Sequence, residues 1–577
     1  MSSNEDYRKK DKFLERLEMF VADTAYINGQ IWTMRKEGEK VSAIVVYDEK
    51  IIFAGETDEA KKYAVKETVD LGGKHVLPGF TDTHLHLLLN CISQERVDLA
   101  EATSIEEIVS KMKAESDPDA EWILGDNVHI ERLADGRFPE RLELDQISVD
   151  KPVMLYSYCQ HAQMGNSLAM KRGGIEVGTV PANEGEIEFY EDGTPNGVIR
   201  ETTYANYLSD IIEAASKDAG YRKKLLRKYL PYYNSQGLTS LQTFSALSND
   251  PLEYIDEYFE LDREGSLSMR IVLNASVDVP NNLRTVSGFG NNRIKLGAKK
   301  IFCDGSLSSR SAALFEPYAD APDEYGILVV DQDEMTREVK NAYKSGMDLA
   351  VHSIGDRSME IVLNAIEATL EEAGYEHPSV SFSGSLEDAP DGFASAAEEI
   401  YSKSDRRFRI IHDMLVTPEQ IERIRKLPVV LDVQPIFIRN WVRIAEDRLG
   451  PERVKHLMPF KTYIESGLLV TGGTDAPVES TDPLIGIQCA VTRADLTGYP
   501  KEGFLPEQAL SVFEAVSLFT RNAAYCTSEE NIKGTLEYGK LADFIVLSEN
   551  IFEISPDKIA EIEIEKTYIG GQEVYSK

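Results

Sequence analysis

Short apolar runs alternate with stretches of helical periodicity along most of the chain. This alternation is typical of an α/β fold in which strands and helices follow one another along a mostly parallel sheet. Eight strands with intervening helices predict a closed (β/α)8 TIM barrel, whose functional groups gather at the carboxyl ends of the strands. The eight candidate strands cover residues 76–84, 238–244, 269–275, 298–304, 348–353, 408–413, 428–434 and 468–475.

Strand-like alternation is also concentrated at the two ends of the chain. One β-rich segment covers about residues 24–77, and the other runs from about residue 532 onward and contains a Gly-Gly hairpin turn. Each segment alone is too short to bury the face of a sheet, whereas the two ends of a domain usually lie close together. We therefore predict one small β-sandwich from residues 20–79 and 530–577, with the barrel in residues 80–529.

The segment from about residue 90 to residue 235 is too long for a single crossover between two barrel strands. We predict that it forms an inserted subdomain over the barrel mouth, where it would shape the substrate pocket.

Composition narrows the range of partners. Acidic residues outnumber basic ones by 98 to 62, and a net charge of −36 repels phosphate backbones, so we expect no nucleic-acid partner.

The chain contains no uninterrupted apolar stretch of the ~18 to 20 residues that a membrane span needs, and its charged N-terminus does not resemble a signal peptide. The five cysteines are scattered, which favours reduced thiols. We expect a cytoplasmic protein with a small-molecule substrate, and a homodimer is a reasonable assembly.

The most informative polar residues are histidines placed in apolar runs. Residues i and i+2 of a strand share a face, so His84 and His86 in P-G-F-T-D-T-H-L-H-L would point the same way and could hold one metal ion. An H-x-H pair alone is a weak signal. However, His352, His412 and Asp475 each end another predicted strand, at the barrel end where sites are built. Because a buried polar group without a partner is costly, one shared metal ion would account for all five.

A lysine adds a further candidate in G-A-K-K-I-F-C-D-G-S. Strand alternation places Lys300, Phe302 and Asp304 on one face and Lys299 on the other. If the first face points inward, Lys300 is poorly solvated and its pKa falls. A neutral amine can add carbon dioxide and become a carbamate that bridges two metal ions. A surface lysine or a salt-bridged lysine is the alternative, and the pattern alone leaves both open.

Longer motifs surround these residues. Together they resemble the amidohydrolase superfamily, and more narrowly the amidohydrolase family 3 branch that includes N-substituted formamide deformylases. The resemblance covers nearly the whole chain and implies metal-dependent hydrolysis on a (β/α)8 barrel. The matching motifs include P-G-F-T-D-T-H-L-H, K-I-F-C-D-G-S-L-S-S-R-S-A-A-L, V-H-S-I-G-D, R-I-I-H-D, G-G-T-D-A-P-V and K-L-A-D-F-I-V-L.

The resemblance also implies roles for individual residues. Asp475 is similar to the catalytic aspartate of the family. Independently of the resemblance, Asp82 shares the strand face of His84 and His86 and could orient one of the imidazoles, and Asp304 is expected to support the ligands in the same way. His161, Arg310 and Gln434 are candidates for contact with the substrate. Imidazole and carboxylate ligands suit Zn²⁺, as one or two divalent ions, with a carboxylated Lys300 as an option. The residues that the resemblance assigns to the metal are His84, His86, Lys300, His352, His412 and Asp475.

The reaction implied is hydrolysis of a C–N bond of an amide, N-formyl or N-acyl compound. Asp475 would take a proton from the attacking water and return it to the leaving nitrogen. A hydrolytic deaminase that acts on a heterocyclic C=N carbon is the alternative. A non-catalytic barrel of the same fold is a third hypothesis, which the apparently complete set of metal ligands disfavours.

Overall fold

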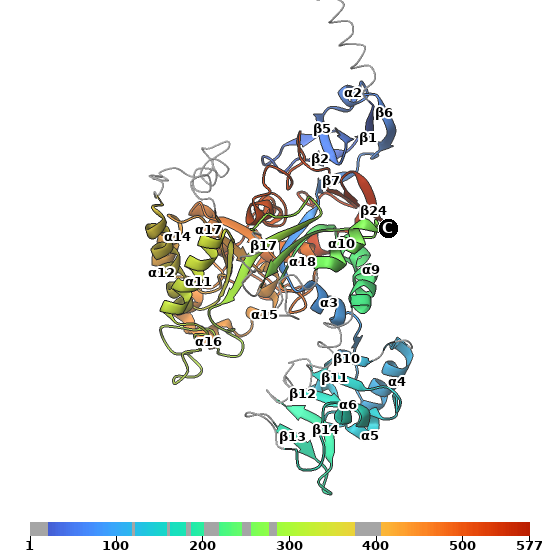
Figure 1. Cartoon of the computed structure of the whole chain (residues 1–577), viewed down its shortest axis with the longest axis vertical. Helices are drawn as coiled ribbons and strands as arrows, with labels where there is room; N and C mark the ends of the chain where they lie inside the picture. Colours follow the sequence, from blue (N-terminus) through green and yellow to red (C-terminus); the bar gives the residue numbers. More distant parts are fainter. Residues whose placement is uncertain are drawn as a thin grey trace, which may run out of the picture. The chain divides into compact units, whose positions relative to one another are not determined.

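The computed structural model describes the chain in two compact units (Figure 1). The first unit contains the chain up to His86 and from Arg227 onward, and the second contains Leu87–Leu226. The described residues are 21–117, 120, 122–157, 162–179, 186–200, 219–244, 255–275, 286–375 and 406–577.

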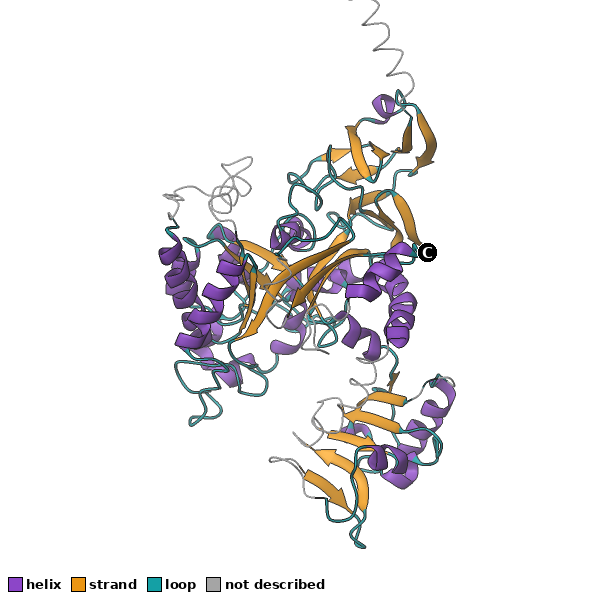
Figure 2. Cartoon of the chain, viewed as in Figure 1, coloured by secondary structure: helices purple, strands orange, loops and turns teal. Residues whose placement is uncertain are grey.

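An eight-stranded parallel sheet forms the centre of the first unit, in the order β21-β20-β19-β18-β17-β16-β15-β8. Figure 2 shows these strands with helices around them. A barrel strand overlaps each of the eight predicted strands, and the (β/α)8 barrel is confirmed. The strands are β8 (Phe80–Leu85), β15 (Leu238–Phe244), β16 (Arg270–Ala275), β17 (Ile294–Phe302), β18 (Leu349–Ser353), β19 (Phe408–His412), β20 (Val429–Val433) and β21 (Leu469–Gly472).

Local sequence signals explain where the helices of this unit begin and end. Helix α11 starts where the Asp331 side chain accepts from the N–H of Glu334, and it ends at Gly346, whose φ of 82° suits a residue without a side chain. Helix α9 (Ala219–Ser235) begins in the second unit and ends in the first. The described helices that follow it are α10 (Ile255–Arg263), α11 (Gln332–Ser345), α12 (Asp356–Ala373), α14 (Pro418–Ile424), α15 (Ile438–Trp441), α16 (Ala445–Arg453), α17 (Phe460–Glu465), α18 (Pro483–Thr492) and α19 (Val512–Leu518).

Buried side chains join the first and last strands of the barrel sheet. Asp82 on β8 accepts hydrogen bonds from the backbone N–H of Thr474 (3.1 Å) and from its hydroxyl (2.5 Å), just beyond β21. The chains approach so closely here that a Cβ at Gly473 would lie 2.6 Å from the backbone nitrogen of His84. Glycine is therefore required at this position, beside the residues that form the candidate site.

The two ends of the chain meet in one six-stranded sheet, in the order β24-β23-β22-β7-β2-β3, and a four-stranded sheet has the order β5-β4-β1-β6. Tyr26, Phe544 and Tyr568 pack together in the core, with ring centroids 4.4 to 5.2 Å apart. The elements are β1 (Ala22–Ile27), β2 (Gln30–Trp32), β3 (Lys40–Val41), β4 (Ala43–Tyr47), β5 (Lys50–Gly55), α2 (Thr57–Ala60), β6 (Val65–Asp70), β7 (His75–Pro78), β22 (Phe544–Leu547), β23 (Ile564–Ile569) and β24 (Gln572–Ser576).

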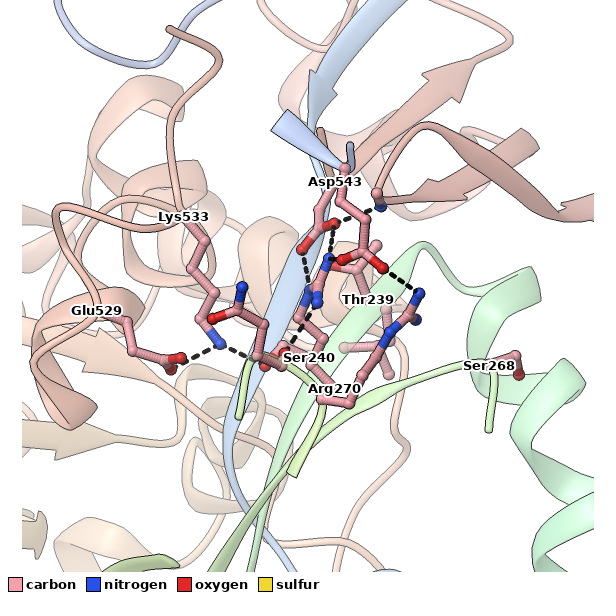
Figure 3. Close-up of polar contacts among 12 residues, drawn as sticks. Thr239, Ser240, Ser268, Arg270, Glu529, Lys533 and Asp543 are labelled. Carbon is pink, nitrogen blue, oxygen red and sulfur yellow. Dashed lines mark hydrogen bonds and ion pairs between the residues drawn. The ribbon is translucent and has the colours of Figure 1, made fainter. Parts of the chain in front are cut away.

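Buried ion pairs tie the barrel strands to the C-terminal segment (Figure 3). Arg270 on β16 donates to both carboxylate oxygens of Asp543, over 2.6 and 2.8 Å. Lys533 donates to the Ser240 hydroxyl on β15 over 2.6 Å and pairs with Glu529 at 2.9 Å. Because each buried charge has a charged partner, this network carries no uncompensated charge into the interior.

The second unit contains a separate six-stranded sheet, in the order β13-β14-β12-β11-β10-β9. Its core includes Ile108, Met112, Leu144 and Leu155. In the described parts of the chain, no helix has both the length and the apolar character that a membrane crossing requires. The elements are α3 (Leu87–Ser93), β9 (Val97–Asp98), α4 (Ile105–Glu115), β10 (Ile123–Val128), α5 (Arg141–Leu144), β11 (Val153–Ser157), β12 (Ala162–Gly165), α6 (Ser167–Arg172), β13 (Glu186–Phe189) and β14 (Pro195–Arg200).

Candidate metal centre

The six predicted metal-site residues line one cavity of about 410 Å³ in the first unit. They come from β8, β17, β18 and β19 and from the loops after β8 and β21. Parallel strands present their carboxyl ends at the same edge of the sheet, which is why residues far apart in the sequence meet here. The six residues are His84, His86, Lys300, His352, His412 and Asp475.

The imidazoles converge on Asp475. Its Oδ1 atom lies 3.1 Å from His84 Nε2 and 3.3 Å from His86 Nε2. Its peptide N–H donates to the carbonyl oxygen of His84 over 2.6 Å, which fixes the loop after β21 against β8. The ligand atoms of His84, His412 and Asp475 lie within 4.8 Å of one another and are therefore grouped as the ligands of a single divalent ion would be.

A backbone contact orients the His86 ring beside Asp475. Its Nδ1 atom lies 3.1 Å from the carbonyl oxygen of Phe244, which can only accept, so Nδ1 carries the hydrogen. In the neutral ring, Nε2 then presents a lone pair to the carboxylate of Asp475. Two acceptors that face each other in a buried site repel, and a bound cation would satisfy both. The side chains present therefore fit a divalent metal ion.

Gln434 determines which nitrogen of His412 can act as a ligand. The Gln434 side-chain nitrogen donates to the carbonyl oxygen of Asp432 over 3.0 Å, which directs its Oε1 atom toward His412 Nδ1 at 2.6 Å. His412 Nδ1 is therefore the donor and Nε2 is left as the acceptor. Gln434 was predicted to contact the substrate, and the structure places it against His412, where it orients the ring.

Replacement of Gln434 by leucine is expected to weaken metal binding by about 10- to 100-fold, because partners of this kind fix the tautomer and orientation of a ligating imidazole. Gln434→Glu should retain most of the affinity, since it keeps an acceptor for Nδ1. The affinity would be measured by competition with a chromophoric chelator. Gln572→Leu, at an exposed position on β24, is the control, and an equal affinity in both leucine variants would contradict the role of Gln434.

His352 is oriented by backbone contacts. Its Nε2 atom donates to the carbonyl oxygen of Gly305 over 3.1 Å, which leaves Nδ1 as the acceptor nitrogen. Burial lowers the pKa of His352 to about 4, so the ring is neutral at pH 7. Asp304 lies 3.6 Å from Nε2 and accepts from the backbone N–H groups of Ile354 and Gly355, over 3.0 and 2.9 Å. Asp304 thus holds the loop that follows His352.

Lys300 and Lys299 point to opposite sides of β17. Lys300 is buried, and its Nζ atom lies 4.9 Å from the ring centroids of both Phe244 and Phe302. Burial lowers the pKa of Lys300 to about 7, so a substantial fraction of the amine is neutral near pH 7. Lys299 pairs instead with Glu338 on α11 at 2.6 Å. The strand therefore delivers one lysine of lowered pKa to the cavity and keeps the other lysine as a charged partner of a helix.

The remaining candidates occupy different positions. Asp82 accepts from the backbone N–H of His84 over 3.0 Å and so supports the strand rather than an imidazole ring. Arg310 makes two hydrogen bonds to Asp320, over 3.1 and 3.0 Å, and is not among the described residues that line the cavity. His161 lies outside the described residues.

Several cavity-lining residues were not identified from the sequence, among them four that follow β20 or β21. Phe437, Asn440 and Trp441 follow β20, and Glu479 lies four residues after Asp475 on the loop that follows β21. They lie in loops and short helices, where no regular period separates inward from outward positions. The one signal in the sequence was the carboxylate of Glu479, because it lies close to Asp475 on the same loop.

Comparison with known proteins agrees with this geometry. The model of the amidohydrolase family matches residues 67–383 and 383–575. A putative amidohydrolase of Bacillus subtilis, YtcJ, is 32% identical over 95% of this chain and 98% of its own. The N-substituted formamide deformylase of Arthrobacter pascens is 25% identical over 95% of this chain and 97% of its own.

A solved structure is similar as well. An uncharacterized metal-dependent hydrolase from Pyrococcus furiosus matches 92% of this chain and 100% of its own, with 30% identity and a TM-score of 0.72. These matches confirm the resemblance inferred from the motifs. The chain belongs to the amidohydrolase family.

Proposed function

We propose that this amidohydrolase uses a bound metal ion to hydrolyse the C–N bond of a small N-formyl or N-acyl compound. The observation that carries the proposal is the convergence of four imidazoles, a buried lysine and Asp475 on one cavity. The similarity to a formamide deformylase over nearly the full length of both chains supports an amide substrate.

The donor set favours zinc over a hard cation, because imidazole nitrogens predominate over oxygens. When bound, zinc supplies a water of lowered pKa and polarises a carbonyl group. We propose His84, His86, His352 and His412 as its imidazole ligands. Lys300 contributes a neutral amine that can attack carbon dioxide and lose a proton, and the resulting carbamate anion would allow a second ion to bind.

Asp475 is the proposed proton carrier. Burial raises the pKa of Asp475, but the contacts that include His84 lower it by more than burial raises it. The pKa therefore lies well below its usual range, and the carboxylate is ionised. An ionised carboxylate can accept the proton of an attacking water and then deliver it to the departing nitrogen, which would otherwise leave as an unstable amide anion. The apolar side chains of Phe437, Trp441 and Met414 line the same cavity and would limit the access of bulk water to this transfer.

The function is tested by a hydrolysis screen of the metal-loaded protein over N-formyl, N-acyl and cyclic amide compounds. Release of an acid and an amine supports the proposal. Release of ammonia from amino-heterocycles, without acid from any amide, would identify a deaminase instead. A protein that binds metal and releases neither product would match the non-catalytic alternative.

Removal of the metal is expected to reduce hydrolysis to the background rate, and zinc should restore it. Added zinc should also raise the unfolding temperature of the stripped protein, because a ligand that binds only the folded state stabilises it. Metal content would be measured on the purified chain and on His412→Ala. His456→Ala, outside the cavity, is the matched control and should retain its metal. Full activity after complete metal removal would exclude a metal-dependent reaction.

A further inference from the structure

One wall of the cavity is formed by residues that the metal centre does not use. They come from the chain after β20 and from the loop after β21, and most of them are apolar or aromatic. Among the described cavity-lining residues, Glu479 is the one carboxylate besides Asp475. The residues of this wall are Phe437, Asn440, Trp441, Ile444, Val478 and Glu479.

Glu479 is buried with incomplete compensation of its charge. Its side chain is 6% exposed, and its Oε1 atom accepts a hydrogen bond from the side-chain nitrogen of Asn440. The Arg439 guanidinium lies 3.5 Å from Oε2, beyond the ~2.7 to 2.9 Å of a charge-assisted hydrogen bond, and is 32% exposed. Burial raises the pKa of Glu479 to about 7, although Arg439 and the backbone N–H of Ser480 both favour the charged form.

A polar group in an apolar pocket usually fixes the orientation of a ligand. Here the carboxylate retains acceptor capacity on Oε2, and the neighbouring rings of Phe437 and Trp441 also favour a cation over an anion. Most of the other side chains of this wall are apolar, which suits a chain of methylene groups rather than a polar linker.

We propose that Glu479 binds a protonated amine on the leaving-group side of the substrate, with Asn440 holding the carboxylate in place. The preferred substrates are then N-formyl or N-acyl derivatives of an amine that carries an apolar chain and a second, positively charged amino group. This inference rests on the proposed function and specifies its substrate class.

A purely structural role is the competing explanation, because the contact between Asn440 and Glu479 joins α15 to the loop after β21. Loss of a structural contact would lower activity equally for charged and neutral substrates. Loss of a recognition contact would change the ratio between them. The ratio of kcat/KM values for a matched pair of compounds therefore separates the two roles.

The pair is N-(6-aminohexyl)formamide and N-heptylformamide, which have the same chain length and differ in one terminal ammonium group. The wild-type protein is expected to prefer the charged compound by about 10- to 100-fold in kcat/KM, as hydrogen bonds to charged groups allow. Glu479→Gln should abolish most of this preference and leave N-heptylformamide within a few-fold of wild type. Glu446→Gln, at an exposed position on α16, should leave the ratio unchanged.

A second variant predicts the opposite change and does not depend on how well Glu479→Gln folds. Arg439→Gln removes the cation that competes for Oε2 and is expected to raise the preference for the charged compound several-fold. An unchanged ratio in both variants, with both compounds hydrolysed, overturns the inference and leaves the proposed function intact.

If the wild-type protein hydrolyses neither compound, the proposed function fails for formamides and the inference is judged by binding. Calorimetric titration of the zinc-loaded protein should then show tighter binding of the aminohexyl compound than of the heptyl compound, and loss of this difference in Glu479→Gln. Equal binding of the two compounds, or no binding of either, overturns the inference.

Discussion

Replacement of Asp475 by asparagine is expected to lower kcat/KM for the hydrolysed amide by about 10²- to 10⁴-fold, the usual contribution of a general acid–base group. Asparagine preserves the shape of the side chain but cannot carry the proton between water and the leaving nitrogen. The backbone should tolerate the change, because residue 475 has a φ of 60° and asparagine is one of the few residues that adopt this conformation readily. The rate would be measured by release of the acid product.

Metal analysis of the same variant separates the two roles proposed for Asp475. Retention of the metal with loss of activity assigns the defect to proton transfer, whereas loss of the metal assigns it to ligation. Asp447→Asn on the exposed side of α16 is the matched control and should retain wild-type activity. Equal product release by the wild type and by Asp475→Asn would rule out the mechanism.

The barrel strands could be predicted because parallel strands covered by helices on their outer face consist of nearly continuous apolar runs. The first predicted strand, residues 76–84, shows where this signal fails. In the structure the run is divided between β7, which pairs with β22 in the end sheet, and β8, which belongs to the barrel. Gly79 lies at the division, where a Cβ would come within 2.2 Å of Thr239. Hydrophobicity alone does not report which sheet a strand joins.

The metal-site residues could be identified for a related reason. The period of two along β17 places Lys300 inward and Lys299 outward, and strand ends meet at one edge of a parallel sheet. Contacts between loops follow no such rule. Arg310 pairs with Asp320 ten residues further along the same loop, and Gln434 contacts His412 from the end of the neighbouring strand. Both contacts depend on the local path of the backbone beyond a strand. The sequence therefore predicted that Arg310 and Gln434 lie near the site, but not which residues they contact.

A buried ion pair lies in two of the strands that also carry residues of the metal centre. Arg409 on β19 and Asp432 on β20 are both fully buried and form an ion pair. Arg409 also donates to Gln242 and to the carbonyl oxygen of Thr83, each over 2.7 Å. The pair thus links β8, β15, β19 and β20 in the barrel interior. Arg409 precedes His412 along β19, and Asp432 precedes Gln434, which follows β20.

Replacement of Asp432 by alanine is expected to destabilise the barrel by about 3–5 kcal/mol, because it leaves the Arg409 guanidinium buried without its counter-charge. The loss exceeds that of a typical core hydrogen bond, since a buried charge keeps its full desolvation cost when its partner is removed. Chemical denaturation would measure the free energy of unfolding of the barrel in the wild type and in the variant. Both proteins should be metal-free, because bound metal would add its own stabilisation to each.

Two controls distinguish charge compensation from loss of packing. The double variant Arg409→Met/Asp432→Leu removes both charges and keeps apolar volume, so it should be markedly more stable than Asp432→Ala. Glu422→Ala breaks an exposed pair with Arg425 on the outside of the barrel and should cost about 0–1 kcal/mol. If Asp432→Ala cost no more than Glu422→Ala, the interior would be hydrated enough to solvate Arg409. The low polarity that we invoke for the lowered pKa of Lys300 would then be wrong.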